Sequence, residues 1–236
     1  MKPQLQAEQN PQPNHVAAPS APASQSVKVD GSLYFRIMRR FIMGFARLYF
    51  RIEFIGFENI PTAGGFIVAP NHQSFCDPFW VSIPFPYPLR YMTWDRFVYM
   101  PVLGHFIRSL GAFPVDIKKG DRTALRLSLE HIKNGGRLMV FPEGGRTKDG
   151  QTMPFKPGVI RLALDAKAPI IPATIVGGYE AYNAHHLFPR PRKVKVVYHP
   201  PIYIHLRQTE KDMKDFLSEQ AAHLQSVVES GLKNKS

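Results

Sequence analysis

The chain carries a histidine and a carboxylate close together in a short polar segment that begins at Asn71. Asp77 follows His72 by five residues, and an imidazole with a carboxylate partner is a common general base near neutral pH. Residues five apart lie about 140° apart on a helix, so a continuous helix would not pair them. Either a bend precedes a helix that starts at Pro78 behind an Asp77 cap, or Asn71 or Ser74 caps an earlier turn. A capping aspartate beside an incidental surface histidine is the alternative interpretation, and this segment alone favours neither.

A second polar cluster, Phe-Pro-Glu-Gly-Gly-Arg-Thr, occupies residues 141–147 and includes Glu143 and Arg146. Both clusters follow apolar runs, 65–69 and 137–141, that are typical of buried strands. Ligands of α/β sheets gather just beyond strand ends, where loops meet helix starts. Two further segments follow the same pattern, a charged loop at 115–122 and a proline-bracketed strand at 168–173. The clusters therefore predict one site rather than separate surface loops.

The apolar periodicity predicts alternating strands and helices. Strands are expected at 51–55, 66–68, 89–93, 111–115, 137–141, 170–176 and 193–198, the last at a sheet edge. Helices are expected at 78–83, 101–110, 122–133, 158–166 and 212–232. In the helix at 122–133, Leu125, Leu127, Leu129 and Ile132 are expected on or near the buried side. This order predicts an α/β fold, with a mixed, mostly parallel sheet and helices on both faces.

The segments before residue 51 differ from the rest of the chain. Residues 1–30 are rich in Pro, Gln, Ala, Ser and Asn and are expected to form a disordered tail without the pattern of a signal peptide. Residues 31–50 predict an amphipathic helix with a basic side and an apolar side. The basic side carries Arg36, Arg40, Arg47 and Arg51, and the apolar side carries Phe35, Met38, Phe41, Ile42, Phe45 and Leu48. Each arginine costs about 2.5–3.5 kcal/mol at a membrane-spanning helix centre, which argues against a span. A membrane-interface helix is favoured over a basic core helix or a partner-binding helix. Residues 51–236 then form the main domain.

The chain has 236 residues, is 44% hydrophobic and carries a formal net charge of +12. It therefore holds enough apolar residues for a folded core, and its charge indicates an anionic partner: nucleic acid, anionic lipid or a phosphorylated substrate. No recognised nucleic-acid-binding motif is present, so no nucleic-acid partner is predicted. The single cysteine, Cys76, allows no intrachain disulfide, and cytosolic exposure is the default.

Three other groups of side chains have alternative interpretations. Cys76 could be a nucleophile activated by His72, but packing is favoured. The histidines fit no compact metal-ligand pattern, so no metal site is predicted; they are His185, His186, His199 and His205. A basic run indicates either a solvated edge strand or a contact with lipid phosphate or an acidic acyl carrier; it consists of Arg190, Arg192, Lys193 and Lys195.

Three motifs in sequence order carry a family resemblance. Asn-His-x-Ser-x-x-Asp at 71–77, Phe-Pro-Glu-Gly-x-Arg at 141–146 and Pro-Ile-Ile-Pro-Ala at 169–173 together resemble the glycerophospholipid acyltransferase family, whose best-known branch is 1-acyl-sn-glycerol-3-phosphate acyltransferase. The resemblance covers about residues 50–205. It implies that His72 is a general base for an acceptor hydroxyl and that Asp77 fixes its tautomer, as in a serine-protease triad without the enzyme nucleophile.

The resemblance also implies which residues bind substrate. Arg146 suits a phosphate group, because a guanidinium can bind two oxygens. Glu143, which precedes Gly144 in the same motif, would orient a basic group or hydroxyl, and Pro172 of the last motif would shape the site. The chain departs from the family at Gly145, where Thr or Ser is usual, and at Ile117, where Arg is usual. Lys118, Lys119 or Arg122 would supply the second phosphate contact, and these departures put the acceptor's identity in doubt.

The resemblance therefore predicts an O-acyltransferase that moves a fatty acyl group from acyl-CoA or acyl-carrier protein to a lysophospholipid, most simply 1-acylglycerol-3-phosphate. No resident metal or cofactor is implied, and the acyl thioester is a co-substrate. The expected location is the cytoplasmic face of the inner membrane, as a peripheral or monotopic protein. The alternative is a catalytically inactive or non-enzymatic lipid-binding protein of the inner leaflet on the same scaffold.

Overall fold

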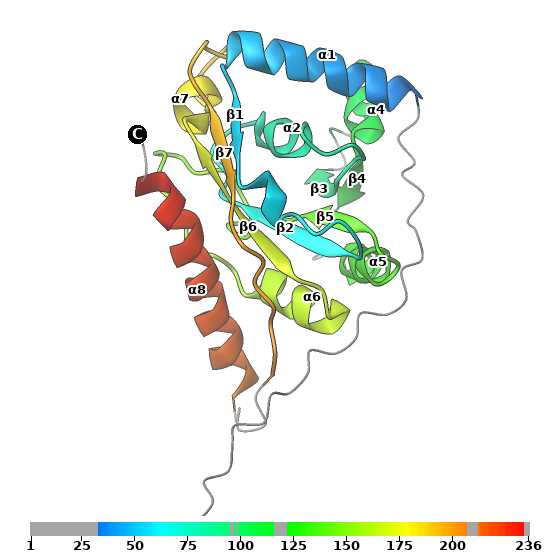
Figure 1. Ribbon diagram of the computed structural model, residues 1–236, viewed down its shortest axis with the longest axis vertical. Helices are drawn as coiled ribbons and strands as arrows, with labels where there is room; N and C mark the ends of the chain where they lie inside the picture. The colour runs from blue at the N-terminus through cyan, green and yellow to red at the C-terminus, as the bar shows by residue number, and fades with distance from the viewer. Residues whose placement is uncertain (1–32, 95–96, 98, 116–121, 207–211, 234–236) are drawn as a thin grey trace, which may run out of the picture.

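A single mostly parallel sheet organises the chain. The computed structural model describes residues 33–94, 97, 99–115, 122–206 and 212–233. Within them the sheet has seven strands in the order β1-β7-β6-β2-β5-β3-β4 (Figure 1). All neighbouring strands are parallel except β6 and β7. The strands are β1 Glu53–Ile55, β2 Phe66–Pro70, β3 Arg90–Trp94, β4 Ala112–Val115, β5 Arg137–Met139, β6 Ile170–Val176 and β7 Lys195–Tyr198. The predicted mixed α/β class is confirmed.

Helices cover both faces of this sheet (Figure 1). One core includes residues of α1, α2, α4 and α7, and the opposite core includes residues of α5, α6 and α8. Their bounds are α1 Leu33–Tyr49, α2 Asp77–Ser82, α4 Pro101–Ser109, α5 Arg122–Lys133, α6 Gly158–Ala166, α7 Gly178–Tyr182 and α8 Met213–Lys233, with a 3₁₀ turn η1 at Phe57–Asn59. The predicted coverage of both faces is therefore confirmed.

Strand β2 divides its side chains between the two cores. Phe66 and Val68 pack into the core beneath α1 and α2, while Ile67 and Ala69 pack into the core beneath α6 and α8. This alternation is the two-residue period of a strand. All five residues of β2 are buried, as a central parallel strand covered on both faces requires. The carboxyl end of β2 is thereby fixed for the polar loop that follows it.

Two predictions about individual elements are wrong. Strand β7 lies between β1 and β6, so it is not an edge strand. Of the charges that indicated an edge, Arg190, Arg192 and Lys193 precede the strand and Lys195 is its first residue, while the strand itself buries Val196 and Tyr198. On α5, Leu125 and Leu127 are 53% and 48% exposed, because the buried side of the helix runs through Ser128 and Ile132, one turn apart. The predicted burial of Ile132 is confirmed, and Leu129 packs partly buried against the core.

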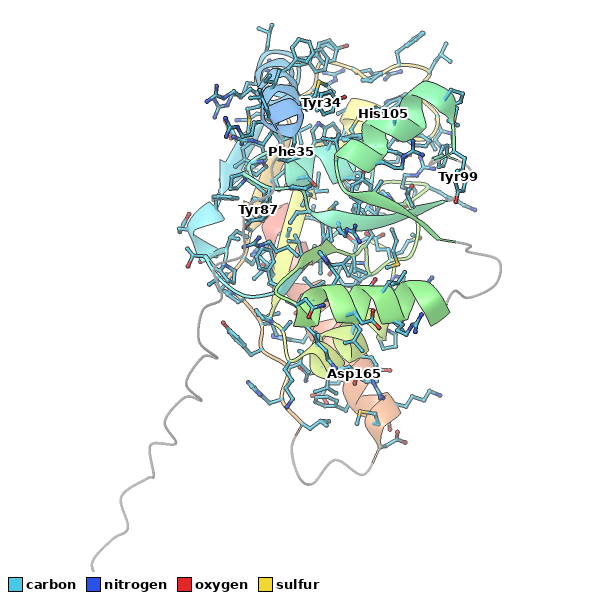
Figure 2. The ribbon with its side chains drawn as sticks, turned by 90° about the vertical axis from the view of Figure 1, so that its right-hand side faces the viewer. Tyr34, Phe35, Tyr87, Tyr99, His105 and Asp165 are labelled. Carbon is cyan, nitrogen blue, oxygen red and sulfur yellow. The ribbon has the colours of Figure 1, made fainter. Side chains whose placement is uncertain are left out.

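Helix α1 packs on the domain through one side and leaves the other open. Phe35 and Ala46 are buried, whereas Phe41 and Leu48 are 72% and 85% exposed. Phe35 therefore does not share the outward apolar side on which the hydrophobic pattern placed it, because α1 has apolar residues on two sides. Figure 2 shows the contact of α1 with α4, where the rings of Tyr34 and His105 lie 6.4 Å apart.

The connection from α1 to β1 is short and internally bonded. Both Phe50 and Ile52 donate backbone N–H bonds to Ala46 O, at 3.0 and 3.3 Å. Arg51 between them takes a left-handed conformation with φ of 46°, and the side chains of Phe50 and Ile52 are buried. The direction of α1 relative to the sheet is thus set by local hydrogen bonds and packing.

None of the helices in the described part of the chain is long and apolar enough to cross a membrane. The predicted tail at residues 1–30 lies outside the described residues.

Candidate active site

Polar loops meet at one edge of the sheet. Strand β2 runs parallel to both β5 and β6, so the carboxyl ends of all three strands lie at the same edge. His72 comes two residues after β2, and Glu143 comes four residues after β5. The Thr147 N–H donates to His72 O at 2.9 Å, which joins the two loops directly. The predicted convergence of the two clusters is present in the structure.

The carboxylate of Asp77 organises the loop after β2. Its Oδ2 accepts hydrogen bonds from His72 Nδ1 at 2.8 Å, Gln73 N–H at 2.6 Å and Ser74 N–H at 2.7 Å. Asp77 is fully buried, and a buried carboxylate needs such donors because burial removes its hydration. The pair therefore meets across a bend, which is one of the two geometries that the sequence left open.

Helix α2 starts one residue earlier than the sequence predicted. Asp77 is its first residue, with Cys76 at the N-cap position and no side-chain cap hydrogen bond. The carboxylate of Asp77 is turned back to the preceding bend instead of capping the helix, because the backbone N–H groups of that bend lie within its reach. Pro78 still occupies the first turn, where a missing N–H costs nothing.

The imidazole of His72 is held on two sides. Its ring stacks on Phe141, with centroids 3.8 Å apart and planes 20° from parallel. Hydrogen-bond donation from Nδ1 to the Asp77 carboxylate assigns the tautomer in which Nε2 carries the free lone pair. Nε2 has no hydrogen-bond partner among the described residues, and 16% of the side chain remains exposed. The accessible nitrogen is therefore the basic one.

The carboxylate of Glu143 points into the protein and accepts hydrogen bonds from backbone N–H groups. Its Oε1 accepts the His72 N–H at 2.7 Å, and its Oε2 accepts the Met153 N–H at 2.9 Å. The side chain is 4% exposed, and burial raises the pKa of its carboxyl to about 7 although both backbone bonds lower it. Both oxygens are used within the protein, so Glu143 positions the backbone of His72. The expected contact with a basic group or hydroxyl of a substrate has no support in this geometry.

Two cations lie on the loop after β5. The guanidinium of Arg146 sits over the ring of Phe75, 3.4 Å from its centroid. Its Nη1 is buried and lacks a hydrogen-bond partner among the described residues. The second cation is Lys156, whose Nζ lies so close to Gly144 that a β-carbon there would collide with it. Gly144 has φ of 72°, which favours glycine. The Gly144 of the motif thus makes room for a lysine.

The remaining predicted residues are placed differently. Lys118, Lys119 and Ile117 lie outside the described residues, and Arg122 begins α5 with a side chain that is also outside them. Pro172 is buried within β6, in register with Ala69, and its carbonyl accepts the His199 N–H at 2.9 Å. Pro172 is therefore a sheet residue. Its expected influence on the shape of the site remains a prediction, as do the contacts of Lys118, Lys119 and Arg122.

Sequence reasoning missed the contacts that three residues make at the site. Asn71 is fully buried, and its amide exchanges two hydrogen bonds with Ile175, at 2.7 and 3.1 Å, which fasten the end of β2 to β6. Gly178 lies so near that a β-carbon there would sit 3.2 Å from Asp77 Oδ1. Lys156 was the third. Asn71 directly follows β2 and Gly178 comes two residues after β6, which is a usable signal, whereas Lys156 lies 13 residues beyond Glu143 and has none.

The cysteine is poorly suited to act as a nucleophile. Burial, together with the Asp77 carboxylate, raises the pKa of the Cys76 thiol to about 12. A thiolate is then scarce at neutral pH. Among the described residues, no group of three or more His, Cys, Asp or Glu side chains is placed to hold a metal ion.

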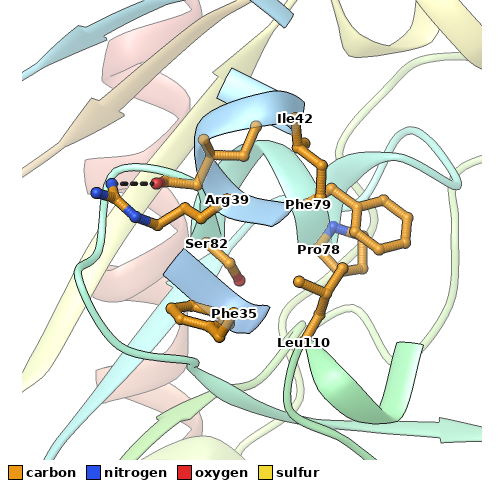
Figure 3. A pocket seen from close by; sticks show the side chains of 8 residues that line it. Phe35, Arg39, Ile42, Pro78, Phe79, Ser82 and Leu110 are labelled. Atoms are coloured by element: carbon orange, nitrogen blue, oxygen red, sulfur yellow. Dashed lines mark hydrogen bonds between the residues drawn. The ribbon is translucent and has the colours of Figure 1, made fainter. Parts of the chain in front are cut away.

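An apolar pocket opens beside the start of α2 (Figure 3). Its cavity volume is only about 20 Å³, little more than one water molecule needs, and it opens to solvent. Pro78 and Phe79 of α2 contribute to it, so the pocket begins one residue after Asp77. The other lining residues come from α1, the end of α2 and the turn after α4: Phe35, Arg39, Ile42, Ser82, Ile83 and Leu110.

Comparisons with known proteins agree on one family. The model of the family described as Acyltransferase matches residues 51–176, more than half of the chain. A 1-acyl-sn-glycerol-3-phosphate acyltransferase of Bacillus subtilis is 26% identical over 179 residues, which cover 73% of this chain and 87% of that protein. The chloroplastic 1-acyl-sn-glycerol-3-phosphate acyltransferase BAT2 of Brassica napus is 28% identical over 167 residues, 66% of this chain and 46% of its own length. This chain thus spans about half of the plant protein.

A solved structure is also similar to the chain. The crystal structure of the 1-acyl-sn-glycerophosphate (LPA) acyltransferase PlsC from Thermotoga maritima superimposes with a TM-score of 0.67 and 27% identity. The similarity covers 83% of this chain and 78% of that one.

Proposed function

Because the chain belongs to the acyltransferase family, we propose that it transfers a fatty acyl group from a thioester to the hydroxyl of a lysophospholipid, with 1-acylglycerol-3-phosphate as the preferred acceptor. The observation that carries the proposal is the buried Asp77 carboxylate on His72 Nδ1, which leaves a basic Nε2 at the surface of the site. The names of the Bacillus subtilis, Brassica napus and Thermotoga maritima proteins support the acceptor.

The reaction needs one base and no nucleophile from the protein. His72 Nε2 takes the proton of the acceptor hydroxyl, and the oxygen attacks the thioester carbonyl carbon to form a tetrahedral intermediate. The carbon–sulfur bond then breaks, an ester remains on the acceptor, and the leaving thiolate takes the proton from His72. Asp77 stabilises the imidazolium between these two steps and keeps Nε2 available at the start.

Two cations support a phosphorylated acceptor. Arg146 carries a buried nitrogen without a partner among the described residues, and a guanidinium binds phosphate oxygens in pairs. Lys156 Nζ lies against Gly144, one residue from Glu143, and adds a compact second charge. We assign both to the phosphate of the acceptor.

The outer side of α1 supports action at a membrane surface. Exposed apolar residues recur along α1 at spacings of three and four; they are Tyr34, Ile37, Phe41, Phe45 and Leu48. Arg36, Arg40 and Arg47 are exposed on the same helix, and α1 contains no acidic residue. A helix of this kind lies in a membrane interface, with its apolar side in the acyl region and its arginines near lipid phosphates. A membrane surface is also where a lysophospholipid and its product reside.

The test is an acyl-transfer assay with the purified full chain. Acyl-CoA and acyl-carrier protein are each offered with lysophosphatidate and with lysophospholipids that carry choline, ethanolamine or glycerol headgroups, and the products are identified by mass spectrometry. We expect transfer to lysophosphatidate, and His72→Ala should reduce kcat by about 10³-fold. His223→Ala, on the exposed side of α8, is the matched control and should retain activity.

Two outcomes would contradict the proposal. Transfer that survives His72→Ala would eliminate His72 as the base. Absence of transfer for every donor and acceptor pair, with vesicle binding retained, would leave a lipid-binding protein instead of an enzyme.

A further inference from the structure

A second exposed apolar element lies on the loop between α7 and β7. Leu187 and Phe188 are 82% and 72% exposed, values comparable to those of Leu48 and Phe41 on α1. Large apolar side chains that are exposed singly are common on protein surfaces, but two adjacent ones at this exposure form a protruding apolar tip. Such a tip can bind a partner surface if the protein holds the loop in a fixed conformation.

Hydrogen bonds fix the base of the loop on both sides. The buried Asn183 donates from Nδ2 to Tyr179 O at 2.9 Å, and its Oδ1 accepts the His185 N–H at 2.9 Å. On the far side of the tip, the Arg190 N–H donates to Ala181 O at 2.7 Å. The two apolar side chains are therefore exposed by a defined loop conformation.

The loop is joined to the outer side of α1. Tyr49, the last residue of α1, donates from its hydroxyl to Pro189 O at 2.9 Å. The ring of Tyr49 also stacks on Phe45, which belongs to the exposed apolar residues of α1, with centroids 5.2 Å apart. Figure 1 shows the loop after α7 at the same end of the molecule as the carboxyl-terminal end of α1. The apolar tip thus continues the apolar side of α1.

The charged residues of the loop that carries the tip are all positive. Arg190, Arg192 and Lys193 follow it and are exposed, and residues 183–195 contain no Asp or Glu. Lys193 pairs with Glu53 at 2.7 Å, whereas Arg190 and Arg192 have no carboxylate partner among the described residues. An apolar tip beside free arginines is complementary to a bilayer with anionic headgroups.

The loop also reaches the active site through aromatic contacts. Tyr182, directly before the loop, lies 5.5 Å from the ring of Phe75. Phe75 in turn carries the guanidinium of Arg146 on its face. If this loop docks on a bilayer, these contacts therefore also fix the distance between Arg146 and the lipid phosphates.

From these contacts we infer that Leu187 and Phe188 form a second membrane-insertion element, which enters the interface of an anionic bilayer together with the outer side of α1. The inference rests on the proposed membrane-surface function and extends it to a two-point attachment. A second attachment point restricts the orientation of the protein on the bilayer more tightly than the apolar side of α1 does by itself.

Tryptophan probes test insertion at each point. Phe188→Trp and Phe41→Trp report on the loop and on α1, and Tyr203→Trp, at a 60% exposed position in the segment after β7, is the control. The full chain is mixed with vesicles of phosphatidylcholine and phosphatidylglycerol whose acyl chains are brominated, and the quenching of the parent chain is subtracted. We expect quenching at 188 and 41 and none at 203.

A substitution pair measures the contribution of the loop. Leu187→Ser with Phe188→Ser should weaken partitioning into the same vesicles about tenfold, equivalent to about 1.4 kcal/mol. Transfer in detergent micelles should be unchanged, because neither residue touches the site. Leu125→Ser with Leu127→Ser, an exposed pair on α5, is the matched control and should leave partitioning unchanged.

The outcomes separate this inference from the proposed function. Quenching at 41 without quenching at 188, or unchanged partitioning of the serine pair, would overturn the inference and leave α1 as the attachment. Absence of quenching at both positions would overturn membrane attachment altogether, while the acyl-transfer assay would still decide the reaction. A fluorescence change at 188 on addition of acyl-carrier protein, without quenching by lipid, would assign the loop to a protein partner and also overturn the inference.

Discussion

The two loops at the carboxyl edge of the sheet are built in opposite ways. In the loop after β2, the Asp77 carboxylate satisfies three donors of its own loop, including His72 Nδ1. In the loop after β5, Arg146 keeps a buried nitrogen without a partner in the described part of the chain, and Lys156 has no ion-pair partner there. The first loop uses its charged group to hold its own residues, although Asp77 Oδ1 and Gln73 Oε1 lack partners in the described part of the chain, whereas the second keeps its cations available for a ligand.

This difference separates two tasks. A base must be oriented before the substrate arrives, because reorganisation during the reaction would add to the barrier. A phosphate-binding cation, in contrast, must keep hydrogen-bonding capacity free for the ligand. We therefore expect substitutions in the first loop to lower kcat and substitutions in the second to raise KM for the acceptor. Substitutions in the two loops should therefore separate the effects on kcat from the effects on KM.

Asp77→Asn removes the negative charge that organises the loop after β2. The substitution keeps the size of the side chain but places an amide where three donors converge, so His72 loses its tautomer and orientation. We expect kcat to fall by about 10³- to 10⁴-fold, with little change in KM for lysophosphatidate, in steady-state acyl-transfer assays. Asp165→Asn, on α6 (Figure 2), should behave as the parent chain. A variant that lost affinity while keeping kcat would refute the division of tasks.

Arg146→Lys and Lys156→Met test the two cations of the loop after β5. Each removes charge-assisted hydrogen bonds to the acceptor phosphate, which are worth about 1.5–3 kcal/mol apiece. The expected result is a rise in KM for lysophosphatidate of roughly tenfold or more, with kcat changed far less, measured by varying the acceptor at saturating donor. Lys148→Met changes an exposed lysine of the same loop and serves as the control. Equal KM values for parent and variants would remove both residues from the phosphate site.

Glu143→Gln tests the connection between the loops through its pH dependence. The pKa of Glu143 is raised from 4.5 to about 7. Between these values the folded chain holds a proton that the unfolded chain has released, so this group's contribution to stability falls as pH rises through the window. Parent minus variant free energies of unfolding, from urea titrations, should decrease across that window and stay level above and below it.

A matched substitution isolates this effect. Glu219→Gln, at an exposed position of α8, should give a difference that does not vary over the same range. A constant difference for Glu143→Gln as well would mean that this carboxyl titrates at its ordinary pH.

Local signals in the sequence were sufficient for much of the fold. The apolar pattern located α6 at 158–166 and α5 at 122–133 with the bounds that the structure has, because strand and helix periodicities differ clearly there. The edge position assigned to β7 was wrong, since strand order is set by packing between distant segments. Nothing near residues 193–198 indicates that β1 adds outside them.

The site was predictable only in part for the same reason. His72 and Asp77 are five residues apart, so their chemistry is visible locally even though the bend that joins them is not. The hydrogen bond from the His72 N–H to the Glu143 carboxylate joins residues that are 71 positions apart. The approach of Lys156 to Gly144 depends on a loop conformation. Such contacts arise from tertiary structure and leave no periodic pattern. The contacts of Lys118, Lys119 and Arg122 fall outside the described side chains and remain predictions.

The hydrogen-bonded connection at Phe50 to Ile52 has a kinetic consequence. It couples the tilt of α1 to the tilt of the sheet. When α1 lies on a bilayer, the catalytic edge is therefore held in a constant orientation relative to the lipid. The acceptor then reaches the site by lateral diffusion within the leaflet, and the search takes place in two dimensions. Turnover should follow the mole fraction of acceptor in the bilayer instead of its bulk concentration, so dilution with inert lipid at constant total acceptor would slow the reaction.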